Sequence, residues 1–564
     1  MDPERSSFRP SAEELQSGWD AFDSYASARG APPTAMIIGV RGRAAVADGA
    51  EGFYFFDPNS TAADNDGTIL QPMGTPGPVP GRWKRISNNV VYVSHFGESS
   101  ARIQAAFTHA ADLGGPVKVV FSPGRAYTVD TTIDATLPHG SVIDASGARI
   151  TCTANTVAFN LNSNANPCNP PGTLRTNITW RGGHLLCTAS NPTSASAGIE
   201  CCNIRDLTIE RVKIESFWYG IKFAGADTYN FKALHLRLCH VGFLLDNWSD
   251  QDGGTTISVH WQDCIFAGGG ISHGTAAIQA FGRMTNVMIS GGSVNGDFDT
   301  GFNFRNNFPP LALDNPVAIT IEGVHFEQGV GDTKYIWFED AQGGNGYLGI
   351  SICGNAFHGN SPIALKLERC RRVRIDGNRF AQTKTGGGRP IEVDANCTSI
   401  YLGGANWLAD AAGQALPNCL CNRAELTLAP EVRLLNAVPL TGYDGNSQSS
   451  GSATIDMSSA LGANYPLISS GVGTAPKGYW VNIQARDSGS AAATGLVGVR
   501  LSKGGVMGNV ERQLLLTLTK LPNNVLAGVS GFVPADGNGD INVALFASGT
   551  NTLDVWIAVT AIAM

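Results

Sequence analysis

The middle third of the chain repeats a short pattern, and this repeat limits the possible folds more than any other feature. Apolar and polar residues alternate, a glycine follows, and a phenylalanine comes three residues later, as in VAITIEGVHFEQG at 317–329, GYLGISICGNAFHG at 346–359 and RRVRIDGNRFAQ at 371–382. One apolar anchor residue marks each unit, and the anchors recur every 23 to 32 residues. They are Trp180, Ile209, Leu236, Trp261, Ile289, Ile321, Ile352, Ile375 and Leu402. A period of this length carried by strands is typical of a solenoid.

Each unit contains three short strands separated by corners. Ile319 and Ile321 share one face of the first strand, because successive strand residues point to opposite sides. Glycine and asparagine at the first corner accept the positive φ that a sharp bend requires. The corners are Gly323, Gly354-Asn355 and Gly377-Asn378, the second strands carry Phe326, Phe357 and Phe380, and the third strands are IWFE at 336–339, LKLE at 365–368 and IEVD at 391–394. The sequence therefore predicts an all-β chain built on a right-handed parallel β-helix, a single-stranded solenoid.

The flanking segments predict three domains. Residues 98–115, ESSARIQAAFTHAADLGG, have a serine N-cap, an apolar face and a Gly-Gly stop, so we expect a helix that caps the first turn of the coil. Residues 1–93 form an N-terminal head and connector, and residues 94–424 form the β-helix. After residue 425 alternating strands separated by Gly, Asn and Ser predict a C-terminal β-sandwich, for trimerisation or carbohydrate binding.

Composition argues against several classes of function. Of 564 residues, 15% are charged and the net charge is −8, so with one small arginine cluster at 369–374 we expect no nucleic-acid partner. No signal peptide and no apolar run long enough to span a bilayer is visible, so we expect no membrane insertion. The 12 cysteines show no CxxC spacing. We expect them reduced and buried, with no metal site and no cofactor.

Three segments resemble bacteriophage tailspikes, polysaccharide depolymerases of the pectate-lyase-like β-helix superfamily. They are GFYFFDPNSTAADNDGTILQP followed by GRWKRI, the segment SSARIQAAFTHAADLGGPVKVVFSPGRAYTV, and the I-x-G-N-x-F units, which together cover roughly residues 50–415. The resemblance implies a homotrimer in the virion, made in the host cytoplasm. Its N-terminal region would join the phage tail or baseplate, and its β-helix would bind and cleave a bacterial surface polysaccharide, an O-antigen or a capsule. The usual acidic Gly/Asp turn is replaced here by HFGESS, so no role of those aspartates is carried over.

Outward residues of the third strands predict one candidate site. Successive units place Ala224, Asp246, Phe281, Arg305, Glu339, Glu368 and Asp394 in one column, and Asn303, Trp337, Lys366 and Glu392 in the column before it. We expect Glu339, Glu368 and Asp394 to be the acid/base set of a glycoside hydrolase, because neighbouring turns match the carboxylate spacing of retaining enzymes and alternate turns that of inverting ones. Trp337 is the expected sugar platform, with Asn303, Arg305 and Lys366 beside it. The alternative is a solvated or intersubunit face with neutralised charges.

A second candidate site lies at the first corner. There Glu327, His325 and His358 accompany Glu215 and Asn295, with Asp297 and Asp299 in the loop NGDFDTGF. Trp218 could line either groove. A polysaccharide lyase remains an alternative, since Lys366, His325 and His358 could supply a base. A receptor-binding adhesin without turnover is the third possibility.

Overall fold

The computed structural model describes most of the chain up to residue 408 and the strands beyond it. The described residues are 21–74, 79–162, 175–202, 204–224, 228–246, 258–268, 274–282, 284–296, 298–306, 317–327, 334–340, 346–359, 363–382, 390–394, 396–403, 406–408, 427–428, 433–434, 438–440, 451–456, 478–487, 493–503, 510–521, 526–534, 541–549 and 553–562. They fall into two compact units, residues 1–288 and 289–564, which are described separately.

In residues 1–288 a coil of parallel strands forms three sheets. Sheet 1 contains β6 (Val90–Tyr92), β7 (Lys118–Val120), β10 (Val142–Asp144), β13 (Arg175–Arg181), β16 (Ile204–Glu210), β19 (Thr228–Lys232) and β22 (Ser258–Gln262). Sheet 2 contains β8 (Ala126–Val129), β11 (Arg149–Cys152), β14 (His184–Cys187), β17 (Lys213–Glu215), β20 (His235–Arg237) and β23 (Ile265–Ala267). Sheet 3 contains β9 (Ile133–Asp134), β12 (Val157–Asn160), β15 (Ala197–Cys202), β18 (Tyr219–Ala224), β21 (Val241–Asp246) and β24 (Gly274–Phe281). Strand β25 (Thr285–Ser290) spans the division.

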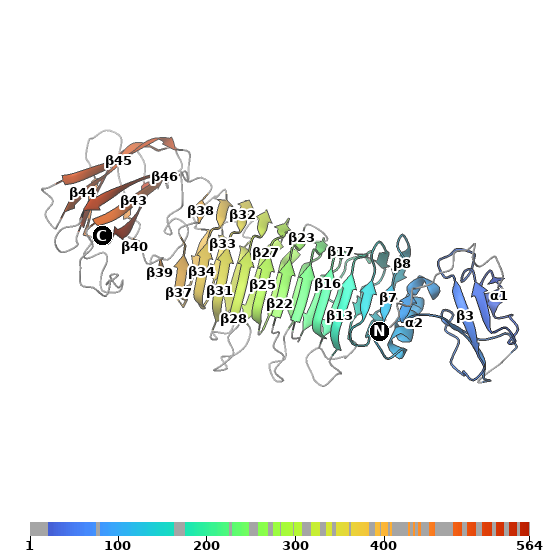
Figure 1. Ribbon diagram of the computed structural model, residues 1–564. Coiled ribbons are helices and arrows are strands. Elements are labelled where there is room, and N and C mark those ends of the chain that lie inside the picture. The colour runs from blue at the N-terminus through green and yellow to red at the C-terminus, as the bar shows by residue number, and fades with distance from the viewer. Residues whose placement is uncertain are drawn as a thin grey trace. The chain divides into compact units, whose positions relative to one another are not determined.

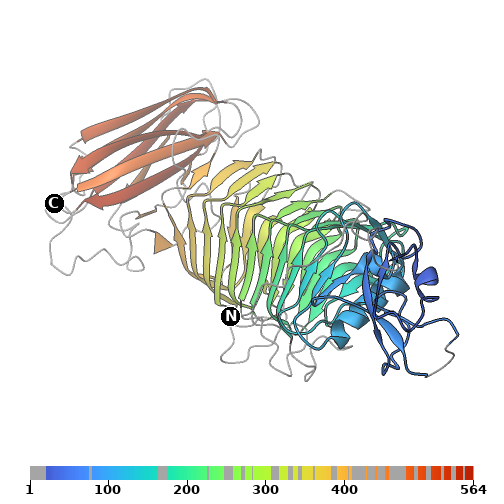
Figure 2. The ribbon, with the colours of Figure 1, turned by 45° about the vertical axis from the view of Figure 1, so that its right-hand side comes forward.

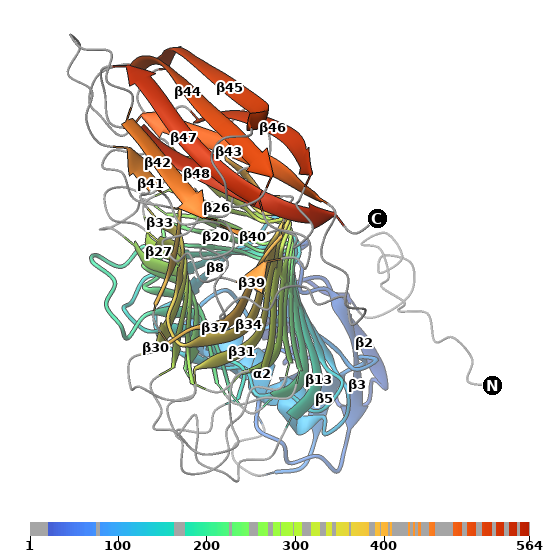
Figure 3. The ribbon, with the colours of Figure 1, turned by 90° about the vertical axis from the view of Figure 1, so that its left-hand side faces the viewer.

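Residues 289–564 continue the same three-strand pattern. Sheet 1 here contains β28 (Val317–Glu322), β31 (Tyr347–Cys353), β34 (Cys370–Asp376), β37 (Thr398–Leu402) and β39 (Thr427–Leu428). Sheet 2 contains β26 (Ser293–Asn295), β29 (His325–Glu327), β32 (Ala356–Gly359), β35 (Arg379–Gln382) and β38 (Trp407–Leu408). Sheet 3 contains β27 (Phe298–Asn306), β30 (Lys334–Asp340), β33 (Ile363–Leu367) and β36 (Ile391–Val393). The strands of one sheet lie side by side, and the turns form three faces (Figures 2 and 3). The predicted parallel β-helix is confirmed.

The interior of the coil consists of files of equivalent side chains. Ile321, Ile352, Ile375 and Leu402 are paired in register and at most 2% exposed. In sheet 2 the rings of Phe326, Phe357 and Phe380 stack at centroid distances of 4.9 and 5.1 Å. Each turn therefore buries its apolar face only against its neighbours, as in other solenoids.

One predicted anchor is wrong. The structure pairs Ile209 with Phe231 and Phe231 with Trp261, whereas Leu236 lies in sheet 2 opposite Ile214. The corner after β19 contains Ala233, which adopts a positive φ of 49°. The next segment also alternates, with Leu234 and Leu236 both buried, so the sequence pattern placed the anchor one strand too late.

The asparagines at the first corner have a different role from the predicted one. Gly354 and Gly377 carry the positive φ values, 66° and 65°, and the asparagines that follow them do not. Instead Asn355, Asn378 and Asn406, each at most 1% exposed, stack on successive turns as a hydrogen-bonded ladder. Each amide donates to a carbonyl of an adjacent sheet 1 strand, as Asn378 Nδ2 does to Ile352 O at 2.8 Å. The ladder satisfies backbone groups that the corner leaves buried.

Helix α2 (Ser100–Asp112) packs on the first turns of the coil. Ile103, Ala106, Phe107 and Ala110 are buried, and the ring of Phe107 lies about 6 Å from those of Phe121 and Phe159. Ser99 occupies the N-cap position, but its side chain makes no capping hydrogen bond. The helix thus covers apolar residues that would otherwise be exposed at the end of the solenoid.

Residues 21–88 form a small head sheet in the order β1 (Ala21–Phe22), β2 (Ile37–Val40), β3 (Gly52–Asp57), β5 (Arg82–Arg85) and β4 (Ile69–Leu70), with a short helix α1 (Tyr25–Ala28). Figure 1 labels α1 and β3 of the head and the helix α2. A 3-10 turn, η2 (Val93–His95), precedes α2. Two carboxylates link head and coil. Asp66 accepts from Arg29 and forms an ion pair with Arg102 of α2 at 2.7 Å, and Glu98 faces Arg43 and Arg125. These contacts fix the head against the capping helix.

The Asp66 contacts predict a pH dependence of stability. Burial raises the pKa of Asp66, but Arg29 and Arg102 outweigh it and hold the pKa below its ordinary value. A carboxyl with a lowered folded pKa stabilises the fold above the unfolded value of about 3.9, and this contribution disappears as pH falls through the folded pKa. Unfolding temperatures measured between pH 7 and 3 should fall less steeply for Asp66→Asn than for the wild type. Asp23→Asn, at an aspartate 68% exposed, is the control, and equal slopes for Asp66→Asn and wild type would contradict the prediction.

Beyond residue 427 the strands are antiparallel and form two sheets. One has the order β40 (Arg433–Leu434), β48 (Leu553–Ile562), β43 (Gly478–Asp487) and β46 (Leu526–Pro534), with β41 (Val438–Leu440) also on β48. The other has the order β42 (Gly451–Asp456), β47 (Ile541–Gly549), β44 (Ala493–Lys503) and β45 (Val510–Leu521). The two sheets lie as two layers (Figure 3). The predicted β-sandwich is confirmed, and the apolar last strand, β48, is an internal strand of its sheet.

Within the described part of the chain, no helix is long and apolar enough to cross a membrane. The cysteines there are free and mostly buried.

Candidate functional site

The structure brings the predicted acids of sheet 3 together. Arg305 pairs with Glu339, and Glu368 and Asp394 each directly follow paired strand residues on the next two turns. The backbone N–H of Glu368 donates to Phe338 O, and that of Asp394 to Leu367 O, both at 3.0 Å. The three carboxylates therefore stand on successive turns, whose strands are about 4.8 Å apart.

Each glutamate of this column has a basic partner. Glu339, with 15% of its side chain exposed, lies 3.5 Å from Arg305 Nε. Glu368, 22% exposed, lies 3.0 Å from Lys366 Nζ and accepts a hydrogen bond from Trp337 Nε1 at 3.2 Å. Each of the two like charges that stacking brings together thus has a cation of its own, as the alternative of a face with neutralised charges also expects.

Trp337 is less open than the predicted platform. The ammonium groups of Lys334 and Lys366 lie 4.7 and 4.9 Å from its ring centroid, in cation–π contacts. Asn303, in register with Trp337, is only 7% exposed, and its Oδ1 accepts no hydrogen bond from the described residues. A buried amide oxygen of this kind costs free energy unless a donor such as a ligand hydroxyl reaches it.

The carboxylate of Asp394 accepts hydrogen bonds from nearby backbone groups. Its Oδ1 accepts the backbone N–H groups of Arg369 and Asn396 at 3.1 and 3.0 Å. Burial raises the pKa of Asp394, but these hydrogen bonds, together with one from Cys397, outweigh it and leave the pKa below its ordinary value. A carboxylate held ionised by backbone donors is unsuited to donate a proton. This leaves Glu339 and Glu368 as the chemically available pair.

The second predicted patch is more open. In sheet 2 Glu327 is in register with Asn295 and His358, and it is exposed. The rings of His325 and His358 are perpendicular with centroids 4.9 Å apart. Burial lowers the pKa of His358, and its neighbours His325 and Arg379 lower it further, although Glu327 opposes them.

The other residues of this prediction are placed as follows. Asp299 is exposed at the start of β27, and Asp297 and Trp248 lie outside the described residues. Glu215 belongs to residues 1–288, where it has its own basic partners. Trp218 is half-buried and lies against His240, with ring centroids 3.9 Å apart and an interplanar angle of 32°. Trp180 and Trp261 are buried, in agreement with their assignment to the core.

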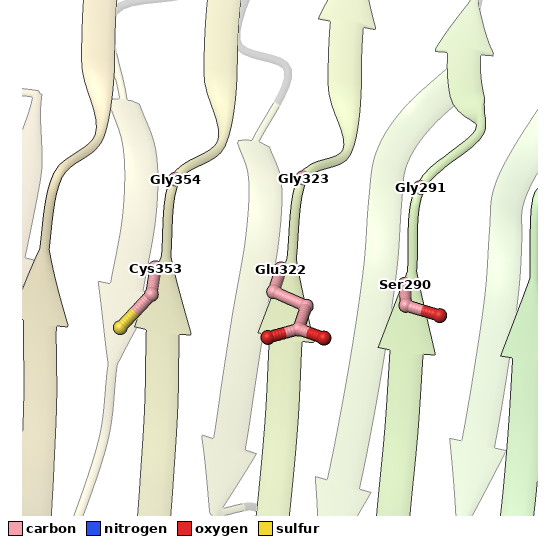
Figure 4. A pocket seen from close by; sticks show the side chains of 6 residues that line it. All are labelled: Ser290, Gly291, Glu322, Gly323, Cys353 and Gly354. Carbon is pink, nitrogen blue, oxygen red and sulfur yellow. The ribbon is translucent and has the colours of Figure 1, made fainter.

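Sequence reasoning missed a hollow of about 450 Å³ at the corner between sheets 1 and 2. Its sides are Ser290, Glu322 and Cys353, and its floor consists of the corner glycines 291, 323 and 354 (Figure 4). A Cβ at Gly354 would meet nothing within 4 Å, so the absence of side chains there leaves the space open. The residues that follow the anchors Ile289, Ile321 and Ile352 are the sequence signal that could have revealed it.

Comparisons with known proteins agree with this architecture. Residues 21–88 match the family described as "Phage tail protein small four-stranded beta-sheet domain", and no curated protein sequence matches the chain. The enzymatically active domain of bacteriophage CBA120 tailspike protein 2 is 13% identical, with a TM-score of 0.54 over 98% of this chain and 87% of that one. The enzymatically active domain of CBA120 tailspike protein 4 is 11% identical, with a TM-score of 0.51 over 98% of this chain and 78% of that one. Tailspike gp49 of Acinetobacter baumannii bacteriophage Fri1, a capsular polysaccharide depolymerase, is 11% identical, with a TM-score of 0.50 over 96% of this chain and 98% of that one.

At these identities the solved structures share the fold with this chain, and the head sheet matches a phage-tail domain independently. With that domain at residues 21–88 and the β-helix fold of these tailspikes, the chain has the architecture of a bacteriophage tailspike.

Proposed function

We propose that the protein binds and depolymerises a bacterial surface polysaccharide, an O-antigen or a capsule, by hydrolysis at Glu339 and Glu368. The observation that carries this proposal is the pair of carboxylates on adjacent turns beside Trp337, with Glu368 held by the indole N–H and Lys366. A spacing of about 4.8 Å is near the 5–5.5 Å of retaining glycosidases. Glu339 would then donate its proton to the leaving oxygen as Glu368 attacks the anomeric carbon and the glycosidic bond breaks. Water, deprotonated by Glu339, would next displace Glu368 from the sugar and restore both carboxyl groups.

The flanking groups would hold the sugar. Asn303 Oδ1 would accept a hydroxyl of the substrate, and Trp337 would offer what remains of its ring to the apolar C–H face of a sugar. Lys334 and Lys366 lie beside that ring, so the bound sugar would contact ammonium groups as well as indole. Asp394 would position the loop after β33 rather than react.

The phage-tail head domain supports a place for the protein in the virion tail. We place its attachment to the tail or baseplate in residues 1–93, the β-helix in 94–424, and a trimerisation or carbohydrate-binding role in 425–564. A homotrimer is part of this proposal.

The His325–His358 pair favours a second candidate, a lyase that acts by β-elimination. A histidine whose pKa is lowered is neutral near pH 7 and can accept the proton next to a uronate carboxyl. Glu327 lies on the same face, with Asp299 as a further acid of this candidate site.

Product analysis tests these alternatives. Purified O-antigen or capsule of the host is incubated with the protein, and chain length and near-ultraviolet absorbance are followed. Shorter chains without new absorbance are expected from hydrolysis, whereas an unsaturated, absorbing end would show elimination. Binding without shortening would leave the adhesin as the function and overturn both enzymatic proposals.

A further inference from the structure

On the outer face of sheet 2 in residues 1–288, basic side chains of three successive turns gather around one carboxylate. We call His184, Lys213, Glu215, His235 and Arg237 the Lys213 cluster. Glu215, 13% exposed, lies 2.8 Å from Lys213 Nζ, 3.1 Å from His184 Nε2 and 3.5 Å from Arg237. His235 is in register with Lys213 on the next strand. The regular stacking of strands therefore concentrates cations here rather than spacing them with acids.

The cluster has more positive than negative charge. Lys213 and Arg237 share the single carboxylate of Glu215, and Arg149, in register with His184, forms no ion pair with a described residue. In register with Glu215, the adjacent strands carry Leu186 on one side and Arg237 on the other, so its column has no second acid there. Lys213, Arg237 and Arg149 thus carry three positive charges against the single negative charge of Glu215.

The pKa shifts of the two histidines also indicate an excess of positive charge in this cluster. Burial lowers the pKa of His235, and Lys213 and Arg237 lower it further, although Glu215 opposes them. Burial also lowers the pKa of His184, again with help from Lys213 and from Arg149. The cations are thus close enough to repel a further positive charge, and for the same reason they would attract an anion.

An aromatic surface lies on the same two turns. Trp218 follows Glu215 by three residues, and His240 follows Arg237 by three. Their ring centroids lie 3.9 Å apart at an interplanar angle of 32°, while His240 Nε2 lies 2.6 Å from Thr275 Oγ1, which fixes the imidazole. Trp218 remains partly exposed. The turn that carries Lys213 thus also carries an indole, and an apolar ring face together with cationic donors is what recognises the ring and the carboxylate of an acidic sugar.

We infer that the Lys213 cluster, with Arg149 and Trp218, binds a carboxylate-bearing sugar, so that the polysaccharide this protein takes contains uronic-acid-type residues. The inference rests on the proposed action on a polysaccharide and adds its chemical class. Exposure of Lys213, Arg237 and His184, at 34, 49 and 30% of their side chains, leaves them accessible to a polymer.

The test measures binding by calorimetry on the full chain in a Glu368→Gln background, which separates binding from cleavage. The probes are oligogalacturonate and the same oligosaccharide after chemical reduction of its carboxyl groups. We expect the acidic form to bind more tightly, and Lys213→Gln/Arg237→Gln to weaken its binding about tenfold or more. Arg149→Gln, which breaks no ion pair, should weaken it in the same direction and guards against misfolding of the double variant.

The matched control removes two charges from another face. Arg371 and Arg372 are exposed in sheet 1, so Arg371→Gln/Arg372→Gln should bind as tightly as the parent. Equal binding of native and reduced oligosaccharide, unchanged binding in the cluster variants, or the same loss in the control would each overturn the inference. Loss of cleavage in Glu368→Gln with binding retained tests the proposed function separately.

Discussion

Replacing Glu368 with glutamine should lower kcat for polysaccharide cleavage by at least about 10²–10⁴-fold, the contribution of a single acid or base group, because an amide cannot replace the carboxylate as nucleophile. The substitution keeps the size of the side chain and its contact with Trp337 Nε1, but it removes the charge that faces Lys366. Glu339→Gln should have an effect of similar size, because the two carboxylates act on one bond. The measurement is the rate of appearance of reducing ends with the natural polysaccharide.

Glu327→Gln is the matched control for this result. Glu327 lies on sheet 2, away from the column of Glu339 and Glu368, and it is exposed. Its substitution should leave kcat unchanged. If only Glu327→Gln abolishes cleavage, the active site is at the His325–His358 patch and the assignment to sheet 3 is wrong.

Asn378→Ala should cost several kcal/mol of stability, the largest effect expected from a polar substitution in the coil. Asn378 Nδ2 donates to Ile352 O, and its Oδ1 accepts the backbone and side-chain N–H groups of Asn355, both at 3.0 Å. Alanine would leave these buried groups without partners, at about 1–3 kcal/mol for each orphaned group. A larger apolar side chain at this position would not restore the lost stability, because the groups left without partners are polar.

The measurement is urea unfolding of the full chain, with hydrogen exchange of the strands that flank Asn378 as a local readout. Asn88→Ala, at an exposed asparagine of the head, should change stability by no more than about 0.5 kcal/mol. An Asn378→Ala variant as stable as that control would show that the ladder contributes nothing.

The repeat predicted most of the coil because one physical requirement acts on every turn. Every turn needs apolar residues that face the interior of the coil, so the sequence repeat alone reveals the stacked residues that include Ile321 and Phe357. The prediction failed at Leu236, where Ala233 forms the corner without a glycine. Leu234 and Leu236 repeat the alternation of an anchor strand, so the sequence pattern alone did not distinguish the two strands.

The candidate site was predicted in part. Alternation within strands placed Glu339, Glu368 and Asp394 in one column, and the register agrees. No sequence pattern indicates that the backbone N–H groups of Arg369 and Asn396 hold Asp394, since such bonds depend on how a loop folds back. The lysines over Trp337 were equally hidden, because Lys334 reaches the ring only through its side-chain conformation.

By itself the sequence determined the coil, its period, the side chains that face inward and the turns on which acids stand, because these follow from the two-residue alternation of strands and the repeat length. Only the tertiary structure decided which acids are free to react, that buried asparagines form a ladder, and that basic residues from separate turns gather around Glu215. Those features include contacts between successive turns, such as Asn355 with Asn378 and His184 with Glu215, and these contacts are set by the packing of one turn on the next.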